Sequence, residues 1–514
     1  LLNCSVHTHM NNLNDLISAG KDTNTCLSAA NSAPLSYAKL RALSQYVQTE
    51  FNRIGIGRND RVALVLPNGA EMASSFISVA CCCTSAPLNP AYRADEFEFY
   101  LGDLNAQALV VEQGSTSPAI EVARKMGISL IELVPTPEQG AGSFTLKLGN
   151  ITPRSAQLAG PALADDVALV LHTSGTTSRP KIVPLTHRNV TASARNIAQS
   201  TQFTSSDRGL NVMPLFHIHG LIAGILAPLS QGGEVHCTSG FNALKFFSQM
   251  SEVSPTWYTA VPTMHQAILS RAANNQEVIA RVPLRFIRSS SSSLPPQVLA
   301  ELEATFKAPV IEAYGMTEAA HQMACNPLPP GIRKPGTVGI AAGPEIAIMN
   351  TEGDLLPMGS TGEIVIRGDN VTLGYENNAK ANQEAFTNGW FRTGDQGSLD
   401  SDGYISITGR LKEIINRGGE KISPREVDEV LMDHPAVAQV VCFGMPHHKL
   451  GEEVAAAVVL KEGASATEKD LRDYTASRLA DFKVPRKILL MDEIPKGATG
   501  KLQRIGMAQK LGLA

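Results

Sequence analysis

Short apolar runs alternate with amphipathic stretches over the first 400 residues. The runs at 62–66, 108–111 and 167–171 contain mainly Val, Leu and Ala, and turn-forming residues follow the first of them. Runs of this length and composition are typical of buried strands. A helical repeat of apolar positions, for example over 37–54, separates such runs. Strands that alternate with helices predict an α/β domain of mixed or largely parallel sheets layered with helices.

The pattern changes near residue 410, where the chain becomes richer in charge. Charged residues make up about 15% of the chain before this point and about 30% after it. Ser423 and Pro424, followed by Glu426, predict a helix start. Strands are expected over 437–443 and 454–460, and a second helix over 467–479. We therefore expect a large N-terminal domain, residues 1–409, and a small α+β C-terminal lobe, residues 410–514.

Composition narrows the classes of function. The 514 residues are 43% apolar and 18% charged, with a net charge of −4 and a pI of about 6.3. This balance argues against a nucleic-acid-binding protein and against a disordered chain. No apolar stretch is long enough to span a membrane. The eight cysteines have no CxxC spacing, which predicts buried reduced thiols and no structural zinc. A cytoplasmic protein is expected, and the C-terminus carries no Ser-Lys-Leu peroxisomal signal.

The first motif with candidate chemistry is the hydroxyl-rich segment 173–181, which follows the apolar run at 167–171. Hydroxyl groups and a flexible glycine offer many hydrogen-bond donors with little bulk, and Lys181 adds positive charge. Such a loop can surround phosphate oxygens. It lacks the second glycine of a Walker A loop, and a simple Ser/Thr-rich turn is the alternative.

Three further motifs carry groups that suit a nucleotide. Tyr314 to Glu318 follow an apolar run and combine a ring for base stacking with a hydroxyl and a carboxylate for a phosphate and a divalent cation. Asp395, after Gly394, can accept from both hydroxyls of a ribose, although an Asx turn also explains it. Lys501 lies between Gly500 and Leu502, where it either meets phosphate charge or is a solvated surface lysine.

In this order and spacing, these motifs resemble the adenylate-forming superfamily of acyl-CoA synthetases, luciferases and peptide-synthetase adenylation domains. Gly409-Arg410 and the segment 418–422 strengthen the resemblance, which covers nearly the whole chain. It implies an ATP-dependent acid–CoA ligase, an enzyme that converts a carboxylate and ATP into acyl-AMP and pyrophosphate. Coenzyme A then takes the acyl group. The expected cofactors and substrates are ATP, Mg²⁺ and coenzyme A, and the C-terminal lobe is expected to move about a hinge at Lys412.

The resemblance also implies roles for particular residues. The catalytic residues would be Lys501, Thr317, Glu318 and His217, of which Glu318 would also hold the metal. Coenzyme A would approach Gly418 and Gly419. ATP or AMP would be bound by Thr173, Ser174, Gly175, Thr176, Thr177, Lys181, Tyr314, Gly315, Asp395 and Arg410.

The acid to be activated depends on the pocket wall, for which His217, Ser291, Ser293 and His321 are the candidates. Imidazoles and hydroxyls would be left unpaired by a long apolar chain, whereas a small doubly charged acid would satisfy them. The segments 288–294 and 312–329 resemble the oxalyl-CoA synthetase branch of the superfamily, so oxalate or another small dicarboxylate is expected. A medium-chain or aryl acid, loading of a carrier protein, and an ATP-binding protein without catalysis are the alternatives. A monomer or small homo-oligomer is expected.

Overall fold

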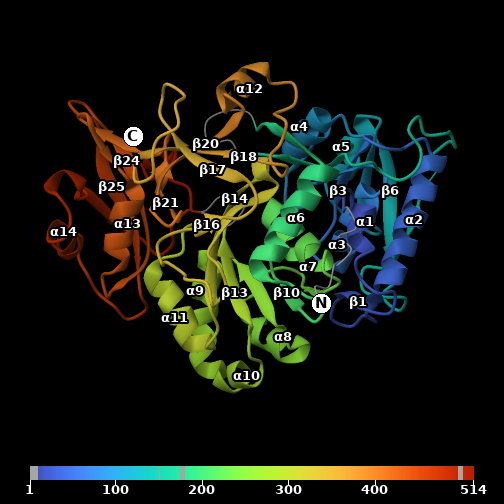
Figure 1. The fold of residues 1–514 in the computed structure, drawn as a ribbon, viewed down its shortest axis with the longest axis horizontal. Helices are drawn as coiled ribbons and strands as arrows, with labels where there is room; N and C mark the ends of the chain where they lie inside the picture. The colour runs from blue at the N-terminus through green and yellow to red at the C-terminus, as the bar shows by residue number, and fades with distance from the viewer. Residues whose placement is uncertain (1–9, 150, 174–179, 496–501) are drawn as a thin grey trace, which may run out of the picture.

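The computed structural model describes residues 10–149, 151–173, 180–495 and 502–514. Four sheets organise these residues. Three of them use only strands that end at or before Arg410, and the fourth uses only strands that begin at or after Ile415. Figure 1 shows the elements of the fourth sheet, coloured orange to red, grouped at one side of the larger part.

The first sheet has seven strands, and five of them run parallel at its centre. Antiparallel strands close both of its edges. In spatial order, the strands are β7 (Phe144–Lys147), β6 (Ser129–Pro135), β5 (Ala108–Glu112), β3 (Arg61–Val65), β4 (Thr84–Pro87), β8 (Val167–His172) and β9 (Ile182–Thr186).

The second sheet has nine strands, with six parallel strands at its centre. Its antiparallel members again lie toward the edges. The spatial order is β16 (Ile340–Ala341), β15 (His321–Cys325), β14 (Val310–Met316), β13 (Phe286–Ser290), β12 (Trp257–Ala260), β10 (Arg208–Asn211), β11 (Glu234–Cys237), β1 (Thr25–Ser28) and β2 (Leu35–Ser36).

The remaining sheets have five strands each. The third is antiparallel and comprises β17 (Glu345–Met349), β18 (Thr361–Arg367), β19 (Phe386–Thr387), β20 (Trp390–Leu399) and β21 (Ile405–Arg410). The fourth comprises β22 (Ile415–Arg417), β23 (Glu420–Ile422), β24 (Val437–His447), β25 (Gly451–Leu460) and β26 (Lys487–Leu490).

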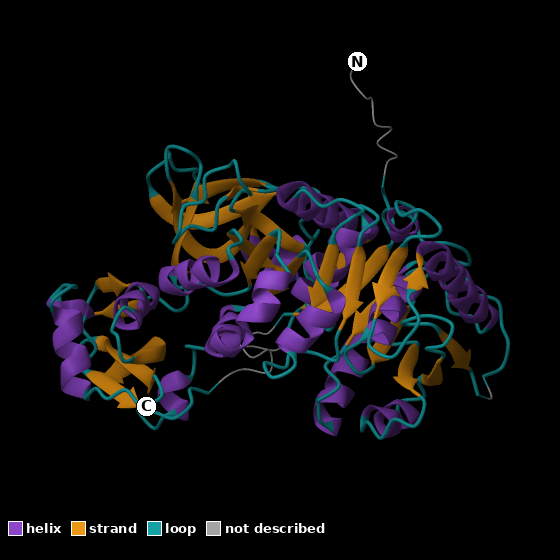
Figure 2. Ribbon diagram, turned by 90° about the horizontal axis from the view of Figure 1, so that it is seen from below, coloured by secondary structure: helices purple, strands orange, loops and turns teal. Residues whose placement is uncertain are grey.

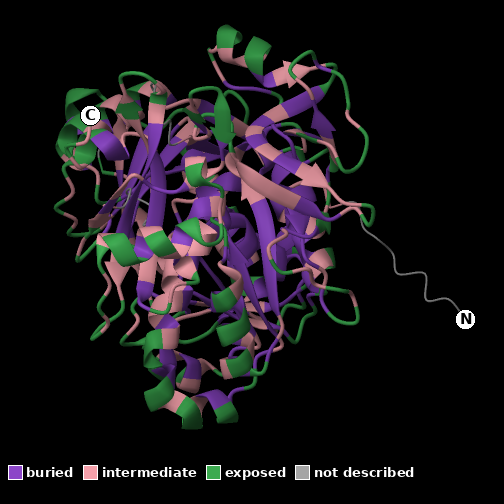
Figure 3. Cartoon of the chain, turned by 90° about the vertical axis from the view of Figure 1, so that its left-hand side faces the viewer, coloured by how far each residue is buried: buried purple, intermediate pink, exposed green. Residues whose placement is uncertain are grey.

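Helices flank the strands, as Figure 2 shows. Helix α6 packs against β8 and β9 of the first sheet and against β15 of the second, so it lies between the two. Figure 3 shows buried residues concentrated on the strands and exposed residues on the outer helices and loops. The α-helices are α1 (Leu13–Ile17), α2 (Tyr37–Arg53), α3 (Ala70–Ala80), α4 (Ala94–Leu104), α5 (Ala119–Lys125), α6 (His187–Thr201), α7 (Ala227–Leu229), α8 (Phe246–Val253), α9 (Pro262–Ala272), α10 (Gln276–Arg281), α11 (Pro296–Phe306), α12 (Ala379–Ala385), α13 (Pro424–Met432), α14 (Glu468–Ala476) and α15 (Met507–Lys510).

The predicted α/β architecture with mixed sheets is confirmed. The helix expected at Ser423 is α13, where the Ser423 side chain accepts from the backbone N–H of Glu426. In the serine run 289–293, Ser289 and Ser290 lie buried in β13, and Ser291 and Ser292 form a bend after it. The predicted helix over 467–479 ends three residues early, at Ala476. Its cap at Thr467 is a capping box, which satisfies the first backbone donors.

The seven cysteines in the described part of the chain are buried and free, as expected of reduced thiols. Within the same residues, no cluster of three metal-ligating side chains occurs. None of the described helices is long and apolar enough to cross a membrane.

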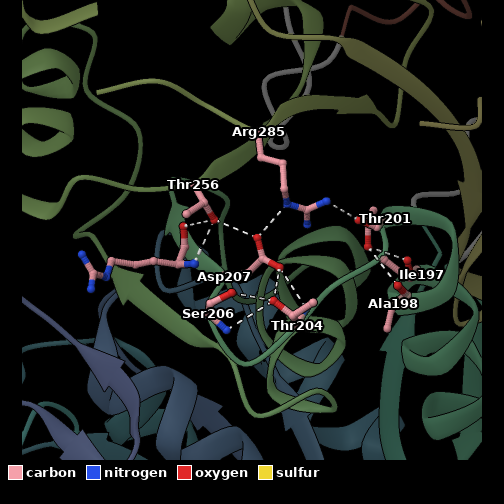
Figure 4. A network of polar contacts seen from close by, with 9 residues as sticks. Ile197, Ala198, Thr201, Thr204, Ser206, Asp207, Thr256 and Arg285 are labelled. Atoms are coloured by element: carbon pink, nitrogen blue, oxygen red, sulfur yellow. Dashed lines mark hydrogen bonds and ion pairs between the residues drawn. The ribbon is translucent and has the colours of Figure 1, made fainter. Parts of the chain in front are cut away.

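A polar network ties α6 to the amino ends of three neighbouring parallel strands (Figure 4). The Asp207 carboxylate accepts from Arg285 Nε at 2.9 Å, from Thr256 Oγ1 at 2.9 Å and from the backbone N–H of Thr204 at 2.8 Å. Arg285 Nη1 also donates to the carbonyl of Thr201, at the end of α6, at 2.8 Å. Asp207 is almost fully buried, so these donors replace the water that its charge would otherwise bind.

Replacing this carboxylate should destabilise the fold. We expect Asp207→Ala to lower the free energy of unfolding by about 3 kcal/mol, because Arg285 loses its counter-ion and buried donors lose their acceptor. Denaturant midpoints would measure the change. As a control, Asp165→Ala removes an exposed partner of Arg188 and should cost less than about 1 kcal/mol. Equal midpoints for the two variants would contradict the importance of the network.

Candidate functional site

Tyr314, Asp395 and Arg410 meet although they come from two different sheets. The Tyr314 hydroxyl donates to Asp395 Oδ2. Asp395 on β20 lies opposite Arg410 on β21, and Arg410 Nε is 3.1 Å from Asp395 Oδ1. Burial, and then the Asp395 charge, raise the pKa of Tyr314 well above its usual value, and the same charge raises the pKa of Arg410. The tyrosine therefore stays protonated and donates to a carboxylate that is also paired with a cation.

A second group forms around Glu318, which is buried in the one-turn 3₁₀ helix Thr317–Ala319 directly after β14. The Tyr375 hydroxyl donates to Glu318 Oε1 at 2.8 Å. Lys181 Nζ lies 4.3 Å from the centre of the Tyr375 ring, a cation–π distance. Burial, followed by the Glu318 charge, raises the pKa of Tyr375. Tyr375 thus links two predicted residues, although no motif in the sequence pointed to Tyr375 itself.

Thr173 and Lys181 close the ends of the predicted phosphate loop. The backbone N–H of Thr173 donates to the carbonyl of Lys181 at 3.0 Å, and the N–H of Lys181 donates back to Thr173 Oγ1 at 3.2 Å. The two residues lie at the ends of β8 and β9, which pair antiparallel. Four members of the predicted loop lie outside the described residues, as does the predicted catalytic lysine: Ser174, Gly175, Thr176, Thr177 and Lys501.

A buried cation forms the third group. The Arg288 side chain on β13 is fully buried, and its Nη2 is 3.1 Å from both His321 Nε2 and Gln322 Oε1. Its Nη1 is 3.4 Å from His219 Nε2 and 3.5 Å from Thr259 Oγ1. Among the described residues, Arg288 Nε has no hydrogen-bond partner, and no carboxylate forms an ion pair with this guanidinium. Burial lowers the pKa of Arg288 to about 10, which still leaves it charged at neutral pH.

Two histidines complete the buried group. The rings of His219 and His321 stack with centroids 4.9 Å apart. His219 Nδ1 is 3.0 Å from Ser291 Oγ, and its Nε2 is 2.7 Å from Thr259 Oγ1. We call Arg288, His219, His321, Gln322, Thr259 and Ser291 the buried polar cluster. Two predicted acid-pocket residues, Ser291 and His321, belong to it.

The other two predicted acid-pocket residues lie elsewhere. The ring of His217 is 4.5 Å from that of Phe216, and its carbonyl accepts from the backbone N–H of Leu221. Ser293 is exposed and lines a cleft that faces α13. Neither His219 nor Arg288 was among the predicted site residues. The segment His217-Ile218-His219 offered a signal for His219, since it contains two histidines of which either could line the pocket. Only the fold decides which of the two imidazoles reaches Ser291.

The buried polar cluster lies beside the tyrosine and glutamate groups because β14 and β15 pair. Gly315 lies opposite Gln322, and Met316 lies opposite His321. A Cβ atom on Gly315 would come within 2.1 Å of the His321 carbonyl oxygen, so only glycine fits. The predicted Gly315 thus permits the contact that brings a buried cation next to Tyr314 and Glu318.

The remaining predicted residues lie farther along the chain. Lys412 is exposed and follows β21. Gly418 and Gly419 form the turn between β22 and β23, with positive φ values of 61° and 101°. Gly418 donates its N–H to the Leu450 carbonyl at 2.8 Å, so this turn is held by its own sheet region.

The fold and these groups define a nucleotide-dependent enzyme class, and comparisons with known proteins agree. Residues 19–376 match the AMP-binding enzyme family, and residues 426–501 match the AMP-binding enzyme C-terminal domain. The chain therefore belongs to the AMP-binding enzyme family. The expected enzyme class is confirmed at this level.

Two curated relatives and one solved structure illustrate the similarity. The chain is 46% identical to the oxalate–CoA ligase of Arabidopsis thaliana, over 94% of this chain and 95% of the relative. It is 41% identical to the oxalate–CoA ligase of Saccharomyces cerevisiae, over 92% of each. The crystal structure of ATP-bound MatB from Rhodopseudomonas palustris superposes with a TM-score of 0.87 at 28% identity, over 98% of each chain.

A buried carboxyl group near the site should make stability depend on pH. Glu312 lies two residues before Tyr314 on β14. Its Oε1 accepts from the backbone N–H of Leu294 at 3.1 Å, and its Oε2 has no hydrogen-bond partner within the described ranges. Burial raises the pKa of Glu312 from 4.5 to about 7. Between these pH values the folded chain keeps a proton that the unfolded chain has lost.

The free energy of unfolding should therefore fall as pH rises from about 4.5 to about 7, by at most about 1.4 kcal/mol per pH unit from this group. Glu312→Gln removes the titration. In denaturant titrations, we expect the difference in free energy of unfolding between the wild type and Glu312→Gln to decrease as pH rises from about 4.5 to about 7. Curves that stay parallel from pH 4.5 to 8 would contradict the raised pKa.

Proposed function

We propose that this protein is an ATP-dependent acid–CoA ligase that activates oxalate or another small dicarboxylate. The observation that carries the proposal is the buried guanidinium of Arg288, which contacts imidazole, amide and hydroxyl groups and has no paired carboxylate in the described chain. The two oxalate–CoA ligases named above, which align with nearly all of this chain, support the same acid.

A buried cation without a counter-ion is costly, and an anionic substrate removes that cost. One carboxylate of a dicarboxylic acid would pair with Arg288, and His219, His321 and Ser291 would supply further polar contacts. The other carboxylate would remain available for reaction. A fatty or aryl acid would instead bury apolar surface against a charge, so the two alternative acid classes fit the cluster less well.

The neighbouring groups would hold the nucleotide. Asp395, fixed by Tyr314 and Arg410, would accept from the two ribose hydroxyls, and Tyr314 would lie near the adenine. Thr317 would contact the α-phosphate. The β- and γ-phosphates would be held by Lys181 and the loop residues Thr173, Ser174, Gly175, Thr176 and Thr177. Positioning and charge neutralisation, rather than covalent chemistry by the protein, dominate such transfers.

The donor set also fits a magnesium ion brought with ATP. Mg²⁺ is commonly bound by one or two carboxylates together with substrate phosphates and water. Glu318 supplies one carboxylate, oriented by the Tyr375 hydroxyl at 2.8 Å. When bound, the ion would neutralise phosphate charge.

The reaction would proceed in two halves. A carboxylate oxygen of the acid attacks the α-phosphorus, the bond to the β-phosphate oxygen breaks, and acyl-AMP and pyrophosphate form. The sulfur of coenzyme A then attacks the acyl carbon, its proton is lost, and AMP leaves. Lys501 would bridge acid and α-phosphate in the first half. His217 would act as a gate between the acid pocket and the nucleotide, and Gly418 and Gly419 would approach coenzyme A in the second half.

Two half-reactions at one site require a rearrangement of the protein between them. We expect residues 410–514 to move as a lobe about Lys412. Support comes from the sheet boundaries, since the fourth sheet contains only strands after residue 414. Hinges of this kind change a few backbone angles at one exposed position. A cytoplasmic location belongs to the same proposal, and the free, buried thiols agree with it.

A panel of acids tests the substrate class. Pyrophosphate release should be faster with oxalate than with malonate, and slowest with a medium-chain fatty acid or 4-coumarate. The reason is that only a second carboxylate provides the charge that Arg288 needs. Preference for the fatty acid or for coumarate would refute the assignment of a dicarboxylate as the substrate. A stable acyl-AMP that is not consumed by coenzyme A would favour transfer to a carrier protein, and no turnover at all would favour the non-catalytic alternative.

The role of the cation is tested by Arg288→Gln. We expect kcat/KM for oxalate to fall about 10²-fold or more, with the KM for ATP unchanged, because the loss is confined to the acid. Arg285→Gln, three residues earlier, is the matched control and should leave kcat/KM for oxalate intact. Since Arg288→Gln removes a buried group, His321→Gln provides a second variant that should also weaken oxalate use. Equal effects of the Arg288 and Arg285 variants would contradict the assignment.

A further inference from the structure

Arg504 is held by two carboxylates in the C-terminal part of the chain. Its Nη2 is 2.7 Å from Asp428 Oδ2, and its Nε is 3.3 Å from Glu413 Oε2. Its Nη1 donates to the Cys442 carbonyl at 3.2 Å. The backbone N–H of Cys442 in turn donates to Asp428 Oδ1 at 2.6 Å. We call Arg504, Glu413 and Asp428 the arginine clamp.

The members of the arginine clamp come from three separate segments. Glu413 is the first residue after Lys412, Asp428 lies on α13, and Arg504 lies near the C-terminus. All three side chains are largely buried, with exposed fractions of 19%, 14% and 24%. Burial alone would lower the pKa of Arg504, but the attraction of Asp428 and Glu413 outweighs it and raises the pKa. Arg504 therefore stays positively charged within the clamp.

The clamp also faces the rest of the molecule. Asp428 and Arg504 line a cleft together with Arg425, and the opposite wall is formed by Ser292 and Ser293, which follow β13. The same β13 carries Arg288 of the buried polar cluster. Arg504 thus lies on the side of the C-terminal part that is turned toward the candidate site.

Chain length connects this clamp to Lys501. Arg504 follows Lys501 by three residues. Three residues span at most about 10–11 Å even when fully extended. The clamp therefore holds the chain at a point three residues after Lys501.

We propose that Arg504 is a positioning residue for acyl-adenylate formation, because the arginine clamp fixes Arg504, three residues after Lys501, to the residue next to the hinge and to α13. Rotation about Lys412 then moves Lys501 with the lobe as one body. The proposal rests on the proposed function for the role of Lys501 and of the hinge, and extends it to a residue that touches no substrate.

Separate measurement of the two half-reactions tests the proposal. Arg504→Gln should lower the rate of pyrophosphate release with oxalate about 10–100-fold, since small displacements of a catalytic group cost this much. Thioester formation from supplied acyl-AMP and coenzyme A should be unchanged. Arg504→Lys keeps the charge but not the two-sided contact, so it should recover part of the loss. Arg486→Gln breaks an exposed ion pair with Asp481 in the same sheet region and should alter neither half.

Two results would overturn the positioning role. One is an equal loss in both half-reactions, which indicates general damage to the lobe, and the other is unchanged pyrophosphate release. A second measurement needs no substrate: the rate of tryptic cleavage after Lys501, followed by mass spectrometry. It should rise in Arg504→Gln relative to wild type and to Arg486→Gln. Unchanged cleavage would refute the anchoring itself, whereas a wild type inactive toward every acid would refute only the proposed function.

Discussion

The close approach of β14 and β15 at Gly315 is the constraint on which the site depends. Because the His321 carbonyl occupies the space of a Cβ atom there, the two strands share a register that no other residue permits. This register puts His321 and Gln322 against the segment that holds Tyr314 and Glu318. A buried cation on β13 and a carboxylate on β20 are thereby brought to the two sides of one strand.

The site divides its charges in a way that suits two different ligands. Asp395 is already balanced by Arg410 and by the Tyr314 hydroxyl, so it can accept from neutral hydroxyl groups without further compensation. Arg288 contacts imidazole, amide and hydroxyl groups and retains a positive charge at neutral pH. A balanced carboxylate suits a ribose, and an unbalanced cation suits an anion. The arginine clamp is a third, balanced arrangement, and its compensation by two carboxylates is consistent with a mechanical role.

Much of the fold was predictable because local physics decides it. Strands β3, β5 and β8 and helix α2 lie where the apolar periodicity placed them, within about two residues. The start of α13 followed from Ser423 and Pro424, whose side chains suit the first turn. Hydroxyl-rich composition favours turns, yet Ser289 and Ser290 of the serine run 289–293 lie in β13. Neighbouring strands, which provide partners such as the Ala313 carbonyl for Ser290, override that preference.

The sequence by itself determined the motifs, their order and the change in charge near residue 410, because these are properties of neighbouring residues. It placed Tyr314, Asp395 and Arg410 in one site by resemblance, and the structure brings them into contact. Only the tertiary structure decided that His219 rather than His217 reaches Ser291, and that Arg288 pairs with no carboxylate in the described part of the chain. Which charges remain unpaired depends on contacts between residues far apart in the chain, and local patterns contain no information about such contacts.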